Sequence, residues 1–219
     1  MAGYRLHCFP ESGGCYKAAL MLALCGADWE PVFIDYFNGE TRTAEWRERV
    51  SEMGEVPVLE HAGKKLSQSG AILHYLADRL GRFGGETEGE RYEILRWILF
   101  DNHKFTGYFA TYRFMRSYVP APPDPGAVAF LKARVDAAFG VVEKHLARMP
   151  FVAGERPTIA DISMMGYMTY PTSETGYDFA VSHPNMAAWI GRIRKLDGFK
   201  SAYDLIPGKR APVKAWPVS

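Results

Sequence analysis

Hydrophobic and polar residues alternate over short stretches at the start of the chain and follow a helical period in most of the rest. Apolar and polar residues alternate from Tyr4 to Cys8, and Pro10 follows, so a strand is expected to end there. Apolar positions then recur at helical spacing from Tyr16 to Leu24, and Gly26 is a typical helix-ending residue. The chain is therefore predicted to begin with a strand, a turn and a helix.

The next segments predict a second strand and helix, and then a hairpin followed by a third helix. Val32–Ile34 is an apolar run that predicts a second strand, and Thr43–Met53 predicts a polar helix. Val56–Leu59 and Lys65–Ser67 flank a glycine-containing turn and predict a hairpin, and an amphipathic helix follows from Ser69 to near Gly81. The order βαβαββα implies a mixed sheet, with one parallel pair and an antiparallel edge, covered by helices.

The second part of the chain carries only helical patterns. One pattern runs from Tyr92 to Met115, and the prolines between Pro120 and Pro125 cannot continue it because they remove amide donors and clash with the preceding turn. A further apolar stripe runs from Phe130 to Leu146, and Thr158 opens another helix. This region is therefore expected to be all-helical.

The change of pattern places a domain boundary in the glycine- and glutamate-rich connection that follows residue 81. We expect an α/β domain over residues 1–81, a linker over 82–87 and an all-α domain over 88–219.

Charge and composition exclude several classes of protein. The 219 residues include 26 Lys and Arg and 25 Asp and Glu, so the net charge of +1 gives no field to hold nucleic acid or an anionic membrane. No stretch approaches the length of a membrane-spanning helix or the pattern of a secretion signal. The three cysteines fit neither a disulfide framework nor a metal site. We expect a cytoplasmic protein without a metal.

The most specific pattern lies around the predicted hairpin. Gly54–Leu59 contains Val56-Pro57, and Leu66–Leu73 contains Gln68-Ser69, where a strand passes into a helix. Free N–H groups in the first turn of that helix, together with the Ser69 hydroxyl, would face a ligand carboxylate. Taken singly, Val-Pro could be a simple turn and Gln-Ser a helix cap.

Together these two segments resemble the signature of the glutathione S-transferase family. The resemblance implies a thioredoxin-like N-terminal domain, an all-helical C-terminal domain and a homodimer. It also implies a cis peptide bond at Pro57, so that the backbone of Val56 pairs with the main chain of glutathione, while Gln68 and Ser69 hold its γ-glutamyl end. Glutathione is then a co-substrate, and a small hydrophobic electrophile is the second substrate.

A second local resemblance lies at Gly154–Asp161. Thr158 can cap a helix and Asp161 can reach back to the Thr158 amide, as in a capping box. The family carries this box in its C-terminal domain, and we expect Asp161 to be buried and structural rather than catalytic.

The turn between the first strand and the first helix is where the family places its activating residue. Ser12 matches the serine of serine-type members, and a hydroxyl donating to the glutathione sulfur beside a helix N-terminus suffices to hold a thiolate. Cys15 lies one helical turn further and is either a buried structural thiol or a redox residue. Tyr4 lies too early, inside the strand, and is expected in the core.

Two features of the site remain undecided from the sequence: how the glycyl carboxylate is bound, and which residues line the hydrophobic-substrate pocket. Many members carry a basic residue before Val-Pro, where this chain has Glu55, so Lys17 or Arg42 would have to bind the glycyl carboxylate unless both are surface charges. The candidates for the hydrophobic-substrate pocket are two residues of the first turn and two tyrosines that could equally be core or interface residues. They are Phe9, Pro10, Tyr108 and Tyr112.

The favoured function is conjugation of glutathione to an electrophile. One alternative is a glutathione-dependent disulfide reductase or isomerase, although Ser12-x-x-Cys15 lacks the first sulfur of a dithiol motif and cannot form an internal disulfide. The other alternative is a non-catalytic binding protein on the same scaffold.

Overall fold

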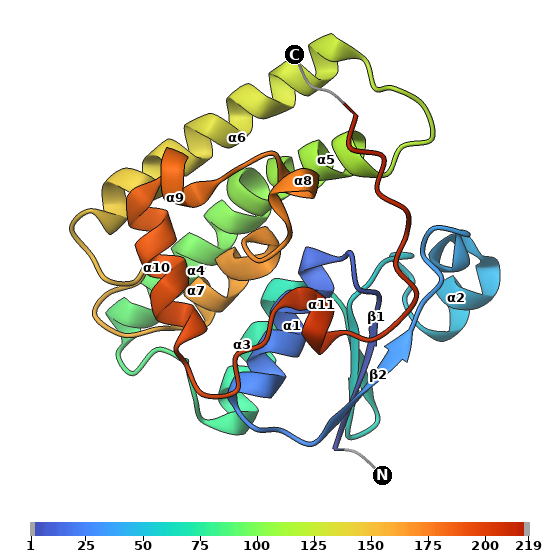
Figure 1. Cartoon of the computed structure of the whole chain (residues 1–219). Coiled ribbons are helices and arrows are strands. Elements are labelled where there is room, and N and C mark those ends of the chain that lie inside the picture. The colour runs from blue at the N-terminus through green and yellow to red at the C-terminus, as the bar shows by residue number, and fades with distance from the viewer. Residues whose placement is uncertain (1–2, 217–219) are drawn as a thin grey trace. The chain divides into compact units, whose positions relative to one another are not determined.

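A computed structural model of the chain describes residues 3–216, and it divides into two compact units (Figure 1). The first unit contains the described chain up to Gly84 together with Leu196–Arg210. The second contains Gly85–Lys195 and the described chain from Ala211 onward. The division after Gly84 falls within the predicted linker, whereas the return of Leu196–Arg210 to the first unit was not predicted.

The first unit is built on a mixed four-stranded sheet with the order β2-β1-β3-β4. The strands are β1 (Tyr4–Cys8), β2 (Trp29–Phe33), β3 (Val58–His61) and β4 (Lys64–Leu66). β1 pairs in parallel with β2, while β1–β3 and β3–β4 are antiparallel. The predicted order and the predicted mixed sheet are thus confirmed.

Helices contact both faces of this sheet. The helices are α1 (Gly13–Leu24), α2 (Ala44–Arg49) and α3 (Ser69–Leu80), with the short 3₁₀ turn η1 (Glu40–Arg42) before α2. α1 packs on β1 and α3. On the other face, Trp46 of α2 packs against Ile34 and Val58, and its ring meets His7 edge to face at 5.5 Å.

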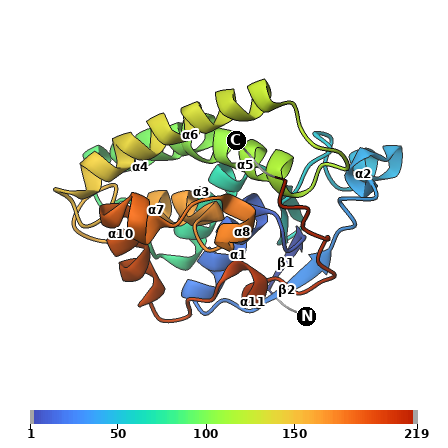
Figure 2. The ribbon, with the colours of Figure 1, turned by 45° about the horizontal axis from the view of Figure 1, so that its top comes forward.

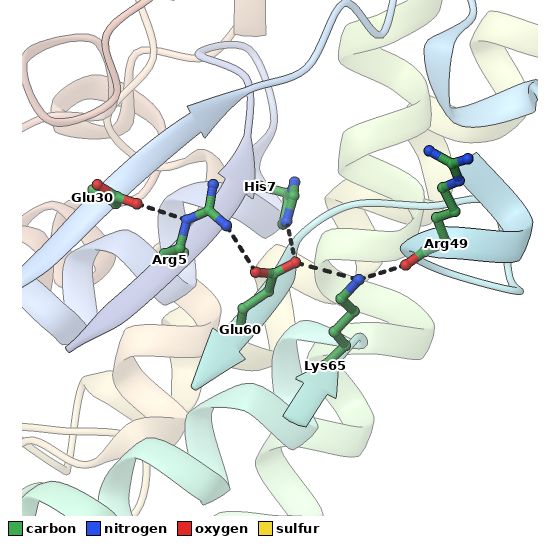
Figure 3. A network of polar contacts seen from close by, with 6 residues as sticks. All are labelled: Arg5, His7, Glu30, Arg49, Glu60 and Lys65. Carbon is green, nitrogen blue, oxygen red and sulfur yellow. Dashed lines mark hydrogen bonds and ion pairs between the residues drawn. The ribbon is translucent and has the colours of Figure 1, made fainter. Parts of the chain in front are cut away.

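A network of charged residues covers part of the same sheet face as His7. Glu60 of β3 accepts hydrogen bonds from His7 Nε2 at 2.9 Å and Arg5 Nη1 at 3.1 Å, and Lys65 Nζ lies 3.6 Å away (Figure 3). Arg5 also donates to Glu30 at 2.6 Å. Burial alone would raise the pKa of Glu60, but the hydrogen bond and charge of His7 and the charges of Lys65 and Arg5 lower it overall.

The returning segment carries α11 (Ala202–Leu205), which packs on α1. The hydroxyl of Tyr16 in α1 donates to the Lys200 carbonyl at 2.9 Å. Gly198 approaches α1 so closely that a β-carbon there would lie 2.4 Å from the Ala23 carbonyl oxygen, and its φ of +85° also favours glycine. These contacts bind the segment to the first unit.

The second unit is helical in its described part, as predicted. Within it, α5 and α6 lie side by side (Figure 2). Its elements are α4 (Glu88–Phe100), the π-helical turn η2 (Asp101–Phe105), α5 (Thr106–Ser117), α6 (Pro125–Leu146), α7 (Ile159–Met164), the 3₁₀ turn η3 (Met165–Tyr167), α8 (Thr172–Thr175), α9 (Phe179–Ser182) and α10 (Pro184–Arg194).

The long helical pattern from Tyr92 to Met115 is interrupted at η2 rather than forming one continuous α-helix. The interruption coincides with Asp101, whose side chain is fully buried. Its carboxylate accepts hydrogen bonds from Thr106 Oγ1 and from Ser163 Oγ, each at 2.5 Å. A π-type turn of this kind locally widens the helix, and here it links α4 and α5 to α7.

The capping box at Thr158 is formed as predicted. Asp161 is fully buried and accepts from the Thr158 amide at 2.8 Å, from the Val152 amide at 2.9 Å and from Trp189 Nε1 at 2.9 Å. It therefore joins α7 to the preceding loop and to α10, which is a structural role.

Within residues 3–216, no helix is long and apolar enough to cross a membrane. The same residues contain no group of three or more His, Cys, Asp or Glu side chains placed to hold a metal ion. Cys8, Cys15 and Cys25 are all unpaired thiols.

Candidate active site

Ser12 occupies the turn that joins β1 to α1, where it is the N-cap of α1. Its Oγ accepts a hydrogen bond from the Cys15 amide at 3.1 Å, and its carbonyl accepts from the Tyr16 amide at 2.9 Å. Because the Oγ acts here as an acceptor, the hydroxyl proton can still be donated to another group. Ser12 is 9% exposed, and the cap fixes the position of its side chain.

The loop that contains Val56 and Pro57 lies against the first turn of α1. The Val56–Pro57 peptide bond is cis, as the resemblance implied. A β-carbon at Gly14 would be in ordinary contact with both residues, 3.4 Å from Pro57 Cδ and 3.7 Å from Ser12 Oγ, so Pro57 and Ser12 both lie next to Gly14. The structure thus brings together Ser12 and Pro57, which are 45 positions apart in the sequence.

The backbone of Val56 has unused hydrogen-bonding capacity. Within the described part of the chain, neither its amide nor its carbonyl has a hydrogen-bond partner. β3 begins only at Val58, so the ladder of the sheet does not include Val56. An extended peptide could therefore pair with this residue by strand addition.

Gln68 and Ser69 lie where β4 passes into α3. Gln68 is the N-cap residue and has φ +65° and ψ +107°, a conformation that costs a non-glycine residue about 1–3 kcal/mol and is concentrated at functional sites. Its side chain does not cap the helix. Instead, its Nε2 donates to Glu55 Oε1 at 2.6 Å. Ser69 is half-buried at the first turn, where the helix dipole favours an anion.

The two other candidates for the activating residue, Cys15 and Tyr4, are buried in the first unit. Cys15 is fully buried, and burial raises the pKa of its thiol to about 12 even though hydrogen bonds to Ser12 and to the Phe9 backbone lower it in part. Tyr4 is 8% exposed and stacks on His61 with ring centroids 4.1 Å apart, so it is a core residue as predicted. Full burial keeps the Cys15 thiol from acting as a reactive thiolate.

The two basic residues considered for the glycyl carboxylate differ in exposure. Lys17 is 1% exposed within α1, so its interpretation as a surface charge is wrong. Arg42 is exposed on η1.

The four candidates for the hydrophobic-substrate pocket are divided between the two units. Phe9 is buried and stacks on Tyr36 with ring centroids 4.6 Å apart, and Pro10 beside it is also buried. Tyr112 is 1% exposed and packs against Tyr177, which fits a core residue of the helical unit. Tyr108 is half-buried on α5 and stays a candidate.

Comparison with known proteins identifies the scaffold on which these residues lie. Residues 4–78 match the model of the glutathione S-transferase N-terminal domain, and residues 111–197 match that of the C-terminal domain. A solved glutathione S-transferase from Pseudomonas fluorescens is 31% identical, with a TM-score of 0.84 over 92% of this chain and 99% of that chain. The chain belongs to the glutathione S-transferase family.

Two further comparisons show how widely the glutathione S-transferase fold is shared. Glutathione S-transferase F14 of Arabidopsis thaliana is 27% identical over 86% of this chain and 81% of that protein. The structure of Ure2p in complex with glutathione has a TM-score of 0.81 at 21% identity, over 90% of this chain and 96% of that chain, a likeness in fold. The predicted thioredoxin-like fold of the N-terminal unit and the helical C-terminal unit are confirmed.

One contact of the candidate site was not found from the sequence. The sequence showed only that Glu55 stands where many family members carry a basic residue. The structure shows that its carboxylate accepts a hydrogen bond from the side chain of Gln68. The two residues are 13 positions apart, and no periodicity relates them. The acidic residue directly before Val56-Pro57 was the only available signal.

Proposed function

We propose that this protein is an enzyme that conjugates the thiolate of glutathione to a hydrophobic electrophile. The observation that carries the proposal is the position of Ser12, which caps α1 with its oxygen, keeps its proton for donation and lies beside Gly14, the residue that Pro57 also approaches. Family membership supports glutathione as the ligand, and the structure of Ure2p shows that glutathione binds to a chain of this fold.

The Ser12 hydroxyl and the N-terminus of α1 can supply the free energy needed to form the thiolate. A free thiol has a pKa of about 8.5, and half-ionisation at pH 7 requires a drop of about 1.5 units, or about 2 kcal/mol. A hydrogen bond to a charged group contributes about 1.5–3 kcal/mol. The N-terminus of a helix adds about 0.3–1 kcal/mol. The Ser12 hydroxyl and the N-terminus of α1 therefore suffice without a metal ion or a general base.

Three other groups would hold the tripeptide in place. The free amide and carbonyl of Val56 pair with the cysteinyl backbone and bring its sulfur toward Ser12. The hydroxyl of Ser69 and the N–H groups of the first turn of α3 bind the carboxylate of the γ-glutamyl residue. Gln68, held in its unusual backbone conformation, binds the same end of the ligand.

In the reaction itself, the sulfur attacks the electrophilic carbon and forms a C–S bond. The leaving group departs with its electron pair, and the proton of the original thiol has already passed to solvent. Holding the thiolate next to the electrophile supplies the rest of the acceleration through proximity. A side chain that stabilises the thiolate and a site that positions both substrates are all that this step requires.

A disulfide reductase or isomerase is less well supported. Such an enzyme would use Cys15, but the raised pKa and full burial of this thiol disfavour the thiolate that exchange needs. Ser12 supplies no sulfur for the first attack.

Calorimetric titration and a conjugation assay test the proposal together. We expect glutathione and S-hexylglutathione to bind with micromolar to millimolar affinity, and an activated halonitroarene to be consumed with release of halide. Binding without any conjugation over a panel of aryl halides, epoxides and unsaturated carbonyl compounds would point to a non-catalytic binding protein. Absence of binding at millimolar ligand would contradict both.

A further inference from the structure

Glu55 places a negative charge beside Gln68, the residue that the proposed function assigns to the γ-glutamyl end of glutathione. Its Oε1 accepts from Gln68 Nε2 at 2.6 Å, and the side chain is half-buried. Within residues 3–216, no lysine or arginine forms an ion pair with this carboxylate. Oε2 therefore keeps its full capacity to accept hydrogen bonds from a ligand.

This charge lies close to a group of the opposite polarity. Gln68 is the N-cap residue of α3, so its side chain connects this carboxylate to the start of a helix whose first N–H groups lack a side-chain cap. The helix N-terminus attracts anions, while Glu55 repels anions and attracts cations. Gln68 therefore connects a partly positive group, the N-terminus of α3, with a negative one, the carboxylate of Glu55.

The γ-glutamyl residue of glutathione carries the matching pair of charges. Its α-carbon bears an ammonium group and a carboxylate, separated by a single carbon atom. The carboxylate can bind at the N-terminus of α3. The ammonium group, one carbon atom away, then needs a hydrogen-bond acceptor close to that helix end. The uncommitted oxygen of Glu55 is such an acceptor, and a bond between two ionised groups is about twice as strong as a neutral one.

We propose that Glu55 binds the α-ammonium group of the γ-glutamyl residue and so makes the enzyme selective for thiols with a free amino group at that end. The proposal rests on the proposed function, since it assumes that glutathione occupies this site. Gln68 acts as a positioning residue that holds Oε1 and leaves Oε2 to the ligand. Glu55 then determines specificity for the ligand's α-amino group, although it stands where many family members carry a basic residue.

Paired ligands test this role directly. S-hexylglutathione and its des-amino counterpart, in which a glutaryl group replaces the γ-glutamyl group, differ only in the ammonium group. For the unmodified protein we expect the des-amino ligand to bind about tenfold more weakly in calorimetry, which corresponds to about 1.4 kcal/mol. Glu55→Gln should weaken S-hexylglutathione by a similar factor and leave the des-amino ligand unchanged, so that the protein no longer distinguishes the two.

Glu52→Gln is the matched control. It removes the same charge three positions earlier from an exposed side chain and should preserve the tenfold discrimination. Glutamine at position 55 keeps a carbonyl oxygen for Gln68 Nε2, so the contact within the site survives, and thermal unfolding verifies that the variant is folded.

The outcomes separate this inference from the proposed function. If Glu55→Gln binds S-hexylglutathione as tightly as the unmodified protein or more tightly, or weakens both ligands equally, the role of Glu55 is overturned while glutathione binding stands. If the unmodified protein binds neither ligand, the proposed function itself fails. Loss of discrimination in Glu55→Gln alone supports the inference.

Discussion

Ser12 Oγ lies 3.1 Å from the amide nitrogen of Cys15, so the side chain that we propose as the partner of the thiolate is also the N-cap of α1. Removing this hydroxyl should therefore have one effect on the bound ligand and another on folding. The two effects can be measured separately.

Ser12→Ala should raise the pKa of bound glutathione by about 1–2 units, because a hydrogen bond to a charged group contributes about 1.5–3 kcal/mol. The ultraviolet absorbance of the thiolate, followed against pH, measures this shift, and affinity for S-hexylglutathione should change little. Loss of the cap should also lower the free energy of unfolding by about 1 kcal/mol.

Thr43→Ala provides a matched control for Ser12→Ala. Thr43 caps α2 through the same kind of bond, from the Trp46 amide to its Oγ1, also at 3.1 Å. This variant should lose about 1 kcal/mol of stability while leaving the thiolate titration where it was. If Ser12→Ala shifts the titration no further than Thr43→Ala does, Ser12 does not stabilise the thiolate.

Asp161→Ala should destabilise the helical unit by about 3 kcal/mol or more, because it leaves several buried donors without an acceptor at a cost of about 1–3 kcal/mol each. These donors are the amides of Val152 and Thr158 and the indole N–H of Trp189. Urea unfolding measures the loss. The conjugation rate per folded molecule should be unaffected, and a selective loss of rate in a fully stable variant would contradict the structural role.

Glu60 should contribute stability at neutral pH that disappears in acid. Its pKa is lowered in the folded protein, so folding is favoured above the ordinary pKa of a glutamate and the contribution is lost as the pH falls through the folded value. Glu60→Gln should lower the free energy of unfolding by about 1 kcal/mol at pH 7 and by much less near pH 3.

Glu30→Gln is the comparison for the Glu60 variant. It removes a carboxylate that pairs with Arg5 across an exposed surface, where both side chains are about half exposed. Exposed pairs contribute about 0–1 kcal/mol, so the free energy of unfolding should stay close to that of the unmodified protein. Equal pH profiles for the two variants would count against a special role of the Glu60 network shown in Figure 3.

The outer face of α4 is predicted to form the interface of a homodimer. Tyr92, Leu95 and Leu99 share one side of the helix at spacings of three and four and are 65%, 40% and 61% exposed, while Ile94, Trp97 and Ile98 are buried. Apolar groups gathered on one exposed helix face mark interaction surfaces.

Light scattering after size exclusion should give twice the monomer mass, and the double variant Leu95→Glu with Leu99→Glu should give the monomer. Val181→Glu changes an apolar side chain that is 82% exposed on α9 and should leave the dimer intact. A monomeric unmodified protein would contradict the prediction.

Local patterns were enough to predict most of the fold. The alternation from Tyr4 to Cys8 and the hairpin around Gly63 depend on neighbouring residues. The first strand formed over the predicted residues, whereas the hairpin strands formed at Val58–His61 and Lys64–Leu66 rather than at 56–59 and 65–67. The capping box also depends on neighbouring residues, because Thr158 and Asp161 are three residues apart. Such features are readable from sequence because their energetics involve only nearby side chains.

The features that sequence did not predict depend on contacts between distant positions. The π-helical turn at Asp101 forms where this carboxylate bonds to Ser163, 62 positions later. The contact of Glu55 with Gln68 depends on how the loop before β3 meets the start of α3. Hydrophobic periodicity reports which face of an element is buried but not which side chains meet across elements.

The return of Leu196–Arg210 to the first unit has a consequence for how the protein is made. The ribosome releases the sheet and its three helices early, but the piece that packs on α1 emerges only after the main body of the helical unit. The hydrogen bond from the Tyr16 hydroxyl to the Lys200 carbonyl can form only then. The first unit therefore cannot complete its packing until residue 210 has been synthesised, and a chain that stops before residue 196 would leave the surface of α1 that contacts α11 uncovered.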